Sequence, residues 1–309
     1  MIMFIEKKGI KSVLFAIALV GVLICGQTLA AAPREFETPQ AATDEFISAL
    51  TADDNAKLEA IFGINPAKFF PHMRNTGKKL DEKIQGFLKK YSKKHTFENE
   101  GNETILCVGK NNWPFFIPLL KTPSGGFYFD VAEGKEELRI RRIGKNELFA
   151  LKVIDAYGDA QREFYRLNYA KSPLKVYAKK ILSDKGQFNG LHWHKKAGTP
   201  DSPLGPYLAW AERNNAKRGT INKPYSGYYF KILTKQGKNA PGGTLNYIED
   251  DMMVHGHGLI AWPARYGKSG IMSFMVSKDG IIYEKDLGED TEAAVYEIDS
   301  FNPDDSWVK

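Results

Sequence analysis

The sequence contains little cysteine: among its 309 residues only Cys25 and Cys107 are of this type. Cys25 lies in an apolar stretch near the N-terminus that we expect to be removed, which leaves Cys107 alone. A single thiol excludes an internal disulfide, so stability must come from the burial of apolar side chains. Cys107 lies in the apolar run TILCVG, and we interpret it as a core residue.

Familiar catalytic motifs are also missing. The chain has neither a Gly-x-Ser-x-Gly elbow nor a His-Glu-x-x-His pair. The stretch YGKSG, residues 266–270, is similar to the end of a phosphate loop, but such a loop needs a glycine at the position that holds Trp262. The following residues are β-rich and are interrupted by Asp279 and Gly280, which is typical of a hairpin. We therefore predict a turn between strands at 266–270, and we predict neither catalytic residues nor a cofactor.

The excess of positive charge is small. The formal net charge is +6, and removal of residues 1–30 takes away three lysines and one glutamate, which lowers it to +4. An excess of this size does not predict nucleic-acid binding. Lysine pairs at 78–79, 89–90 and 93–94 are typical of solvated helix faces, and an acidic polymer or an anionic lipid surface is the alternative partner for them.

Long hydrophobic runs are confined to the N-terminus. Three lysines within residues 7–11 precede an apolar run from Val13 to Cys25, and small residues follow near Ala30. This order is typical of a secretory signal, and the run is too short for a permanent membrane span. We expect cleavage after Ala30 and a mature protein in the periplasm or outside the cell.

The pattern of apolar residues predicts an α+β fold in two units. In residues 31–144, helices that begin near Thr38 and Lys79 precede an antiparallel sheet built from the runs TILCVG, FFIPLL, GFYFDVA and ELRIRRIG. In residues 145–309, a long helix capped by Asn146 precedes a shorter helix from Ser172 to Leu182 and a second antiparallel sheet. Its strands are expected at GYYFKIL, LNYIEDD, GLIAW, IMSFMV and IIYEKD, with a short helix at 291–296. The boundary is placed near Gly144.

Eight motifs in order carry a resemblance to a known family: WPFFIPL, RRIGKNEL, DAQREF, SPLGP, GYYFKILTKQG, APGG, AWPARYG and YEKDLG. The set resembles the exported bacterial family catalogued as domain of unknown function 2950, from about Phe36 to Trp307. That resemblance implies an exported protein and no established activity. More distantly, the first half is similar to the nuclear transport factor 2 class and the second half to the globular part of type II secretion pilins, and such likeness alone warrants no function.

Two His-x-His pairs, His192 with His194 and His255 with His257, are candidates for metal ligation. Side chains two apart on a strand point to one face, so the four imidazoles could bind Zn or Cu if the pairs met. The alternative is four unrelated histidines, since no carboxylate is fixed beside them in the sequence. We predict no metal site from this pattern.

A group of charged residues, together with the polar Gln161, lies around the predicted boundary. It comprises Arg141, Arg142, Glu147, Asp159, Gln161 and Arg162. The arginines could hold a carboxylate or phosphate, or the group could form a salt-bridge network between the units. A further hypothesis makes Glu147 and Asp159 the acid–base pair of a hydrolase or isomerase.

Aromatic side chains beside predicted turns are candidates for partner docking. They are Trp113, Tyr228, Tyr229 and Trp262. Rings of this kind are enriched where partners dock, although they also close cores. Together with the leader and the missing catalytic motifs, they favour a non-enzymatic binding or assembly protein that holds an envelope or extracellular protein or polymer. The sequence leaves the oligomeric state open.

Overall fold

The computed structural model describes residues 32–68, 82–205 and 224–309. The predicted leader and its cleavage point after Ala30 lie outside the described residues. The chain divides into two compact units. The N-terminal unit runs to Trp113 and includes Leu119–Phe129, and the C-terminal unit consists of Pro114–Pro118 and Asp130–Lys309. Both combine helices with antiparallel sheets, which confirms the α+β class.

The N-terminal unit places helices α1 (Pro39–Thr51), α2 (Asn55–Phe62) and α3 (Glu82–Lys93) and the short helix η1 (Pro66–Lys68) before a sheet. Its strands are β1 (His95–Glu100), β2 (Glu103–Val108), β3 (Trp113–Pro114), β4 (Leu119–Lys121) and β5 (Phe127–Phe129), in the order β1-β2-β4-β5 with β3 beside β2. Thr38 caps α1 by accepting from the Ala41 amide at 3.1 Å, as its sequence predicts. The ring of Phe46 lies 5.6 Å from those of Phe62 and Phe129, and Cys107 is buried in β2.

The C-terminal unit begins with one helix of 37 residues, α4 (Val131–Leu167). The strand predicted at ELRIRRIG is wrong, because these residues lie inside α4, and so does Gly144, where the boundary was placed. The Asp130 carboxylate accepts from the Ala132 and Glu133 amides at 3.0 and 3.1 Å and starts the helix. The pair Glu137–Arg141, at 2.9 Å and four residues apart, supports its first turns.

A glycine inside this first part of α4 explains why the sequence pattern misleads. Gly134 resembles a turn residue in the sequence, but a Cβ atom there would lie 2.8 Å from the Ile117 side chain. The glycine therefore permits close approach of the helix to residues 114–118, and it does not end an element.

A four-stranded antiparallel sheet follows α4 in the order β13-β12-β11-β6. Its strands are β6 (Tyr228–Leu233), β11 (Gly258–Pro263), β12 (Met272–Ser277) and β13 (Ile282–Asp286), and helix α6 (Thr291–Glu297) comes after them. Two small strand pairs join β7 (Lys235–Gln236) to β8 (Leu245–Asn246) and β9 (Ile248–Glu249) to β10 (Met252–Met253). The predicted strands and the last helix are confirmed in position, with LNYIEDD divided between β8 and β9.

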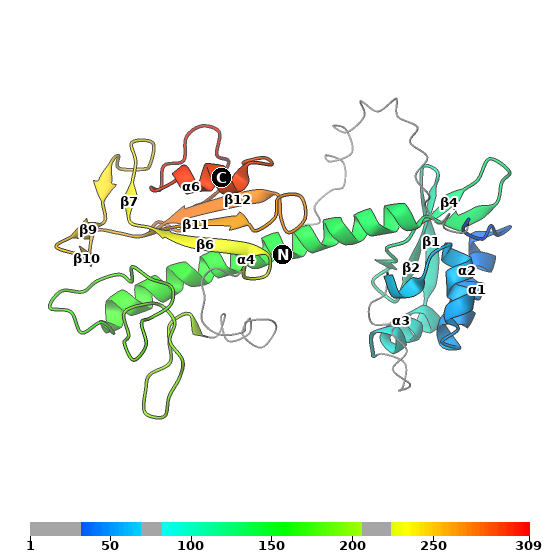
Figure 1. Ribbon diagram of the computed structural model, residues 1–309, viewed down its shortest axis with the longest axis horizontal. Coiled ribbons are helices and arrows are strands. Elements are labelled where there is room, and N and C mark those ends of the chain that lie inside the picture. The colour runs from blue at the N-terminus through cyan, green and yellow to red at the C-terminus, as the bar shows by residue number, and fades with distance from the viewer. Residues whose placement is uncertain (1–31, 69–81, 206–223) are drawn as a thin grey trace, which may run out of the picture. The chain divides into compact units, whose positions relative to one another are not determined.

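The sheet is covered on both faces (Figure 1). On one face Leu259, Ala261 and Phe274 form a core with Tyr157 and Phe164 of α4. On the other face Ile260, Met275 and Tyr283 form a second core with Val295 of α6 and with Phe301 and Trp307. No helix in the described parts of the chain combines the length and the apolar character that a membrane crossing requires.

The helix predicted from Ser172 to Leu182 is wrong. These residues are bends and isolated bridges, including Tyr177 with Met253 and Leu182 with His192. Asn168, in the left-handed conformation at φ 48°, ends α4, and its amide donates to the Ser172 carbonyl at 2.8 Å. Gln161 then fixes the backbone of Ala178 through two hydrogen bonds of 2.9 Å. Tertiary contacts thus override the local Ser-Pro signal for a helix start.

The stretch 266–270 is a turn between β11 and β12, as predicted. Tyr266 and Gly270 bridge across it, and Gly267 has φ 67°. A Cβ atom at Gly270 would lie 2.2 Å from the buried Tyr228 hydroxyl, so this glycine is required for packing. The hairpin at Asp279–Gly280 between β12 and β13 is confirmed as well, with Gly280 at φ 74°.

Candidate functional site

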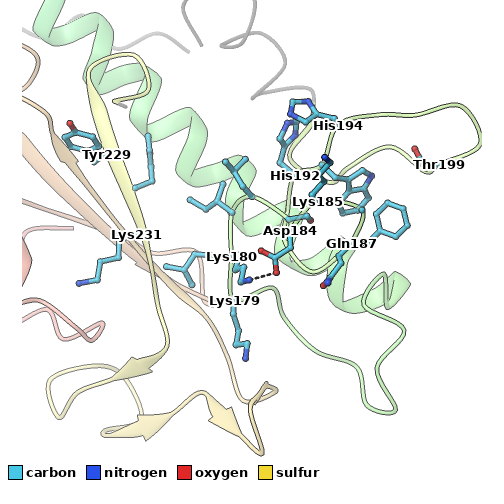
Figure 2. A pocket seen from close by; sticks show the side chains of 18 of the residues that line it. Lys179, Lys180, Asp184, Lys185, Gln187, His192, His194, Thr199, Tyr229 and Lys231 are labelled. Atoms are coloured by element: carbon cyan, nitrogen blue, oxygen red, sulfur yellow. Dashed lines mark hydrogen bonds and ion pairs between the residues drawn. The ribbon is translucent and has the colours of Figure 1, made fainter. Parts of the chain in front are cut away.

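A groove of about 1550 Å³ lies beside strand β6 in the C-terminal unit (Figure 2). One wall is the loop that contains residues 179–188, 192–194, 196 and 199. The other consists of Tyr229 to Ile232 of β6, Trp262 of β11, and Glu292, Val295 and Tyr296 of α6. Its volume exceeds the roughly 300–1000 Å³ of typical small-molecule pockets, so its size fits an extended ligand.

Buried anchors and side-chain caps hold the loop wall in place. Leu191 and Trp193 enter the core beneath α4, and the Trp193 indole donates to the Pro200 carbonyl at 3.0 Å. The Asn189 side chain accepts from the Asp184 amide at 3.0 Å and donates to the Asp184 carboxylate at 2.8 Å. A Cβ atom at Gly190 would lie 2.7 Å from the Leu182 backbone, so only glycine fits there. These contacts fix the conformation of the loop wall.

Positive charge dominates the groove. Five lysines line it, against the two carboxylates Asp184 and Glu292 among the described lining residues. The lysines are Lys179, Lys180, Lys185, Lys196 and Lys231. Figure 2 shows Lys179 and Lys180 on the loop wall and Lys231 on β6.

Salt bridges compensate only part of this charge. Lys180 lies 2.6 Å from Asp184, and its hydrogen bond, followed by that of Asn189, lowers the pKa of the Asp184 carboxyl. Lys179 lies 2.6 Å from Asp251 and lowers the pKa of that carboxyl in the same way. Within the described residues Lys185, Lys196 and Lys231 form no ion pair, and the Lys231 ammonium donates to the Ile298 carbonyl at 2.8 Å. Lys185 and Lys196 therefore present uncompensated cations to an anionic ligand.

Aromatic rings accompany the lysines. Tyr229 and Trp262, both predicted as docking residues, lie 5.6 Å apart between ring centroids in the wall formed by the sheet. Phe188 and Trp193 lie 4.9 Å apart in the loop wall, and Tyr296 of α6 is 86% exposed. The groove therefore combines cations with apolar contact surface, which is the composition of a binding site for a charged chain.

The other two aromatic candidates lie elsewhere. Tyr228 is completely buried, and its hydroxyl donates to the Met272 carbonyl at 2.8 Å, so its prediction as a docking residue is wrong. Strand alternation points Tyr228 into the α4 core, whereas Tyr229 points to the opposite face. Trp113 is 58% exposed and belongs to the N-terminal unit.

The two histidine pairs have different surroundings. His192 and His194 line the groove with ring centroids 5.9 Å apart, and the Nδ1 atom of His192 lies 3.1 Å from the Ser202 hydroxyl. His255 bonds to Glu249 at 2.9 Å, and His257 is buried against Tyr157. In the part of the chain that the structure describes, no three His, Cys, Asp or Glu side chains are grouped to hold a metal ion.

The predicted charge cluster is distributed along α4. Arg141 bonds to Glu137 at 2.9 Å and to the Pro114 carbonyl at 3.0 Å, while Arg142 is exposed. Asp159 and Arg162 form an exposed pair on the same helix. Glu147 and Asp159, twelve residues apart, are separated by about 18 Å along the helix axis, so the structure does not bring them together as an acid–base pair.

Glu147 and Gln161 instead form hydrogen bonds with backbone groups of the sheet and of the loop. The Glu147 carboxylate accepts from the Ile271 and Met272 amides at 2.8 and 3.1 Å, at the start of β12. The neighbouring Asn146 donates to the Ser269 carbonyl at 2.8 Å. Gln161 is completely buried and joins α4 to residue 178. These residues position the sheet and the loop, and neither lines the groove.

We expect Glu147→Ala to lower the free energy of unfolding by about 2 kcal/mol, because two amides of β12 lose their acceptor. Glu147→Gln keeps an acceptor oxygen at the same place, so it should cost less than about 1 kcal/mol. Urea unfolding followed by tryptophan fluorescence measures both values. An equal loss from the two variants would show that the negative charge, and not the acceptor, stabilises this junction.

Sequence reasoning missed the groove lysines. The segment KVYAKKILSDKG carries Lys179, Lys180 and Lys185 close together, and this local excess of charge was the available signal. It was hidden because a helix was predicted from Ser172 to Leu182, on which Lys179 and Lys180 would form an ordinary solvated face. Folding of the loop beside β6 adds Lys231, which no sequence pattern links to the other three.

Comparison with known families agrees with the motif pattern. The family described as "Protein of unknown function (DUF2950)" matches residues 33–309. No curated protein and no solved structure matches the chain. The match confirms the family resemblance found in the motifs, and it leaves the chemistry of the groove to be argued from its residues.

Proposed function

This chain belongs to the DUF2950 family, and we propose that it is a non-enzymatic, exported binding protein that holds an anionic envelope or extracellular partner in the groove beside β6. The observation that carries the proposal is the groove itself, about 1550 Å³ in volume and lined by five lysines together with aromatic rings. The secretory leader expected at residues 1–30 supplies the location, in the periplasm or outside the cell.

Binding, and not catalysis, is the activity that the groove chemistry supports. Among the described lining residues the two carboxylates, Asp184 and Glu292, come from the loop wall and from α6. Asp184 is held by Lys180, which keeps its pKa low, whereas a general acid needs a raised pKa. Lysines on flexible stems and exposed rings instead suit the reversible capture of a charged polymer. We also propose that the C-terminal unit, in which α4 packs on an antiparallel sheet, is similar to the globular part of type II secretion pilins.

Charge reversal in the groove provides the test. We expect the double variant Lys185→Glu with Lys196→Glu to bind poly-glutamate at least tenfold more weakly than the wild type, because attraction at two positions becomes repulsion. Lys152→Glu with Lys175→Glu is the matched control, since it changes the net charge equally at exposed positions of the same unit outside the groove. Fluorescence anisotropy at low and at physiological salt measures both affinities.

The affinities of the two double variants for poly-glutamate together test the proposal. A change of less than twofold in the control, with a large loss in the groove variant, supports a localised site. Equal losses from both would show a general effect of net charge and would contradict a binding function of the groove. Crosslinking of the exported protein in its native setting, followed by mass spectrometry, then identifies the natural partner and the residues in contact.

A further inference from the structure

Strand β6 is an edge of the four-stranded sheet, and its open side faces the groove. Its other side pairs with β11 from Tyr228↔Pro263 to Leu233↔Gly258. The Ala264 amide donates to the Gly227 carbonyl at 2.9 Å, which fixes the alternation of the ladder. In an antiparallel pair every second residue directs its N–H and C=O toward the partner strand, so Tyr229, Lys231 and Leu233 face β11. Phe230 and Ile232 therefore direct their backbone groups outward.

The outward groups of Phe230 and Ile232 have no hydrogen-bond partner among the described residues. Both residues line the groove, and their side chains pack toward the α4 core. Their two amides and two carbonyls thus form a short row of donors and acceptors with the spacing of a β-ladder. A row of this kind is a template for pairing with another extended backbone.

Other parts of the sheet perimeter in the described residues are covered by backbone pairing, in contrast to the middle of β6. On the opposite edge, Glu284 of β13 exchanges two hydrogen bonds with Val308, at 2.7 and 2.9 Å. At the start of β6, Tyr225 pairs with Tyr228 across a tight turn in which Ser226 and Gly227 have φ 46° and 83°. At its end, the Thr234 carbonyl accepts from the Tyr247 amide at 2.9 Å. Native proteins usually cover exposed edges in this way.

We propose that the groove binds an extended, acidic polypeptide segment that adds a strand to β6. This inference rests on the proposed binding function and names the class of partner. Backbone pairing at Phe230 and Ile232 would supply affinity, as in other cases of strand addition. Acidic side chains of the segment would meet Lys185 and Lys196 of the loop wall and Lys231 of β6. A polysaccharide could use the lysines but has no ladder of amides to match the edge, so the edge favours a polypeptide.

A peptide probe and its backbone-modified twin test the proposal. The probe is a synthetic eight-residue peptide of alternating valine and glutamate, and the twin carries N-methyl groups on its four central residues. The charges and side chains are equal, but the twin lacks the amide donors and is too bulky to pair as a strand. We expect the full chain to bind the probe at least tenfold more tightly than the twin, measured by fluorescence anisotropy.

Two variants of one residue locate the pairing. Ile232→Pro removes the outward N–H without removing a bond to β11, and Ile232→Ala removes the same apolar side chain but keeps that N–H. We expect the proline variant to bind the probe and the twin equally weakly, and the alanine variant to retain the preference for the probe. Thermal unfolding of both variants reports whether the sheet is intact. If the proline variant does not fold, the affinities of the wild type for the probe and for the twin still test strand addition.

The outcomes separate this inference from the proposed function. Equal binding of probe and twin by the wild type, with loss in Lys185→Glu and Lys196→Glu, overturns strand addition and leaves an anion-binding groove. Polygalacturonate that binds at least tenfold more tightly than the probe overturns the polypeptide in favour of an acidic glycan. If the groove variant and its matched control bind the probe with equal affinity, the proposed function fails as well.

Discussion

Replacing Gln161 with alanine is expected to lower the free energy of unfolding by about 4 kcal/mol. The Gln161 amide donates to the Tyr157 hydroxyl at 3.2 Å and to the Ala178 carbonyl at 2.9 Å, and its carbonyl oxygen accepts from the Ala178 amide at 2.9 Å. All of these groups are buried, so the truncation leaves the N–H and the C=O of Ala178 without a partner, while the Tyr157 hydroxyl keeps its bond to the Gly258 carbonyl at 2.9 Å. Each unsatisfied buried group costs about 1–3 kcal/mol.

The same substitution should also loosen the groove. Ala178 directly precedes Lys179 and Lys180, so release of its backbone frees the start of the loop wall. We expect faster amide hydrogen exchange in residues 178–183 of the Gln161→Ala variant, together with weaker binding of the acidic probe. Urea unfolding followed by tryptophan fluorescence measures the stability.

Arg162→Ala is the neighbouring control. Arg162 is exposed and pairs with exposed Asp159, so its loss should change stability by no more than about 0.5 kcal/mol. A loss from Arg162→Ala as large as that from Gln161→Ala would contradict the assignment of stability to the buried hydrogen bonds.

Local signals explain which elements the sequence predicts correctly. Thr38 followed by Pro39 marks the start of α1, and Asp279 with Gly280 marks the hairpin between β12 and β13. In each case the residues that define the element are neighbours in the sequence, and their preferences agree with the fold. The apolar periodicity of the second half of α4 predicts a helix correctly for the same reason.

The wrong secondary-structure predictions occur where contacts between residues distant in the sequence determine the local structure. The first part of α4 contains Gly134, whose missing Cβ makes room for Ile117, and Gln161 holds the backbone of Ala178 in the segment after Asn168. Neither contact can be inferred from local propensity. Tyr228 and Tyr229 show a related limit, because the sheet is covered on both faces and the sequence does not say which of two adjacent rings enters the main core.

The candidate site was predictable only in part. Tyr229 and Trp262 were identified from their places beside turns, and both lie in the groove wall. The charged residues of α4 attracted attention because they cluster in sequence, but a helix distributes such residues around its circumference and along its axis. The groove lysines form one surface only after the loop folds beside β6, and that requires the long-range contacts of Leu191 and Trp193.

We expect the stability of this protein to fall as the pH decreases from about 6.5 to about 4, and His257 is the expected cause. Its side chain is 2% exposed, and its ring lies 5.3 Å from that of Tyr157 and 4.9 Å from that of Tyr177. The Nδ1 atom of His257 has no hydrogen-bond partner among the described residues. Burial, followed by repulsion from Arg162 and Lys278, lowers the pKa of His257 to about 4.

The sign of this pH dependence follows from the protonation of His257 in the folded and unfolded states. In the unfolded chain a histidine has its ordinary pKa near 6.5, so below that pH the unfolded state binds a proton that the folded state excludes. The contribution of neutral His257 to the free energy of unfolding is therefore complete above about pH 6.5 and decreases as the pH falls. Below about pH 4 the titration of His257 lowers the stability no further. The expected loss is about 2 kcal/mol at pH 5 and approaches about 3 kcal/mol near pH 4.

Substitution of the ring isolates this effect from other titrating groups. His257→Phe places an apolar ring against the same two tyrosines, so the difference in stability between pH 7.5 and pH 5 should shrink by about 2 kcal/mol relative to the wild type. His255→Gln is the control and should retain the wild-type difference, because His255 is exposed and is not packed in the core. Comparison above pH 5 avoids the carboxylates with lowered pKa, such as Asp184 and Asp251, whose stabilising charge is lost only at lower pH. An unchanged pH dependence in His257→Phe would contradict the exclusion of the proton from this buried ring.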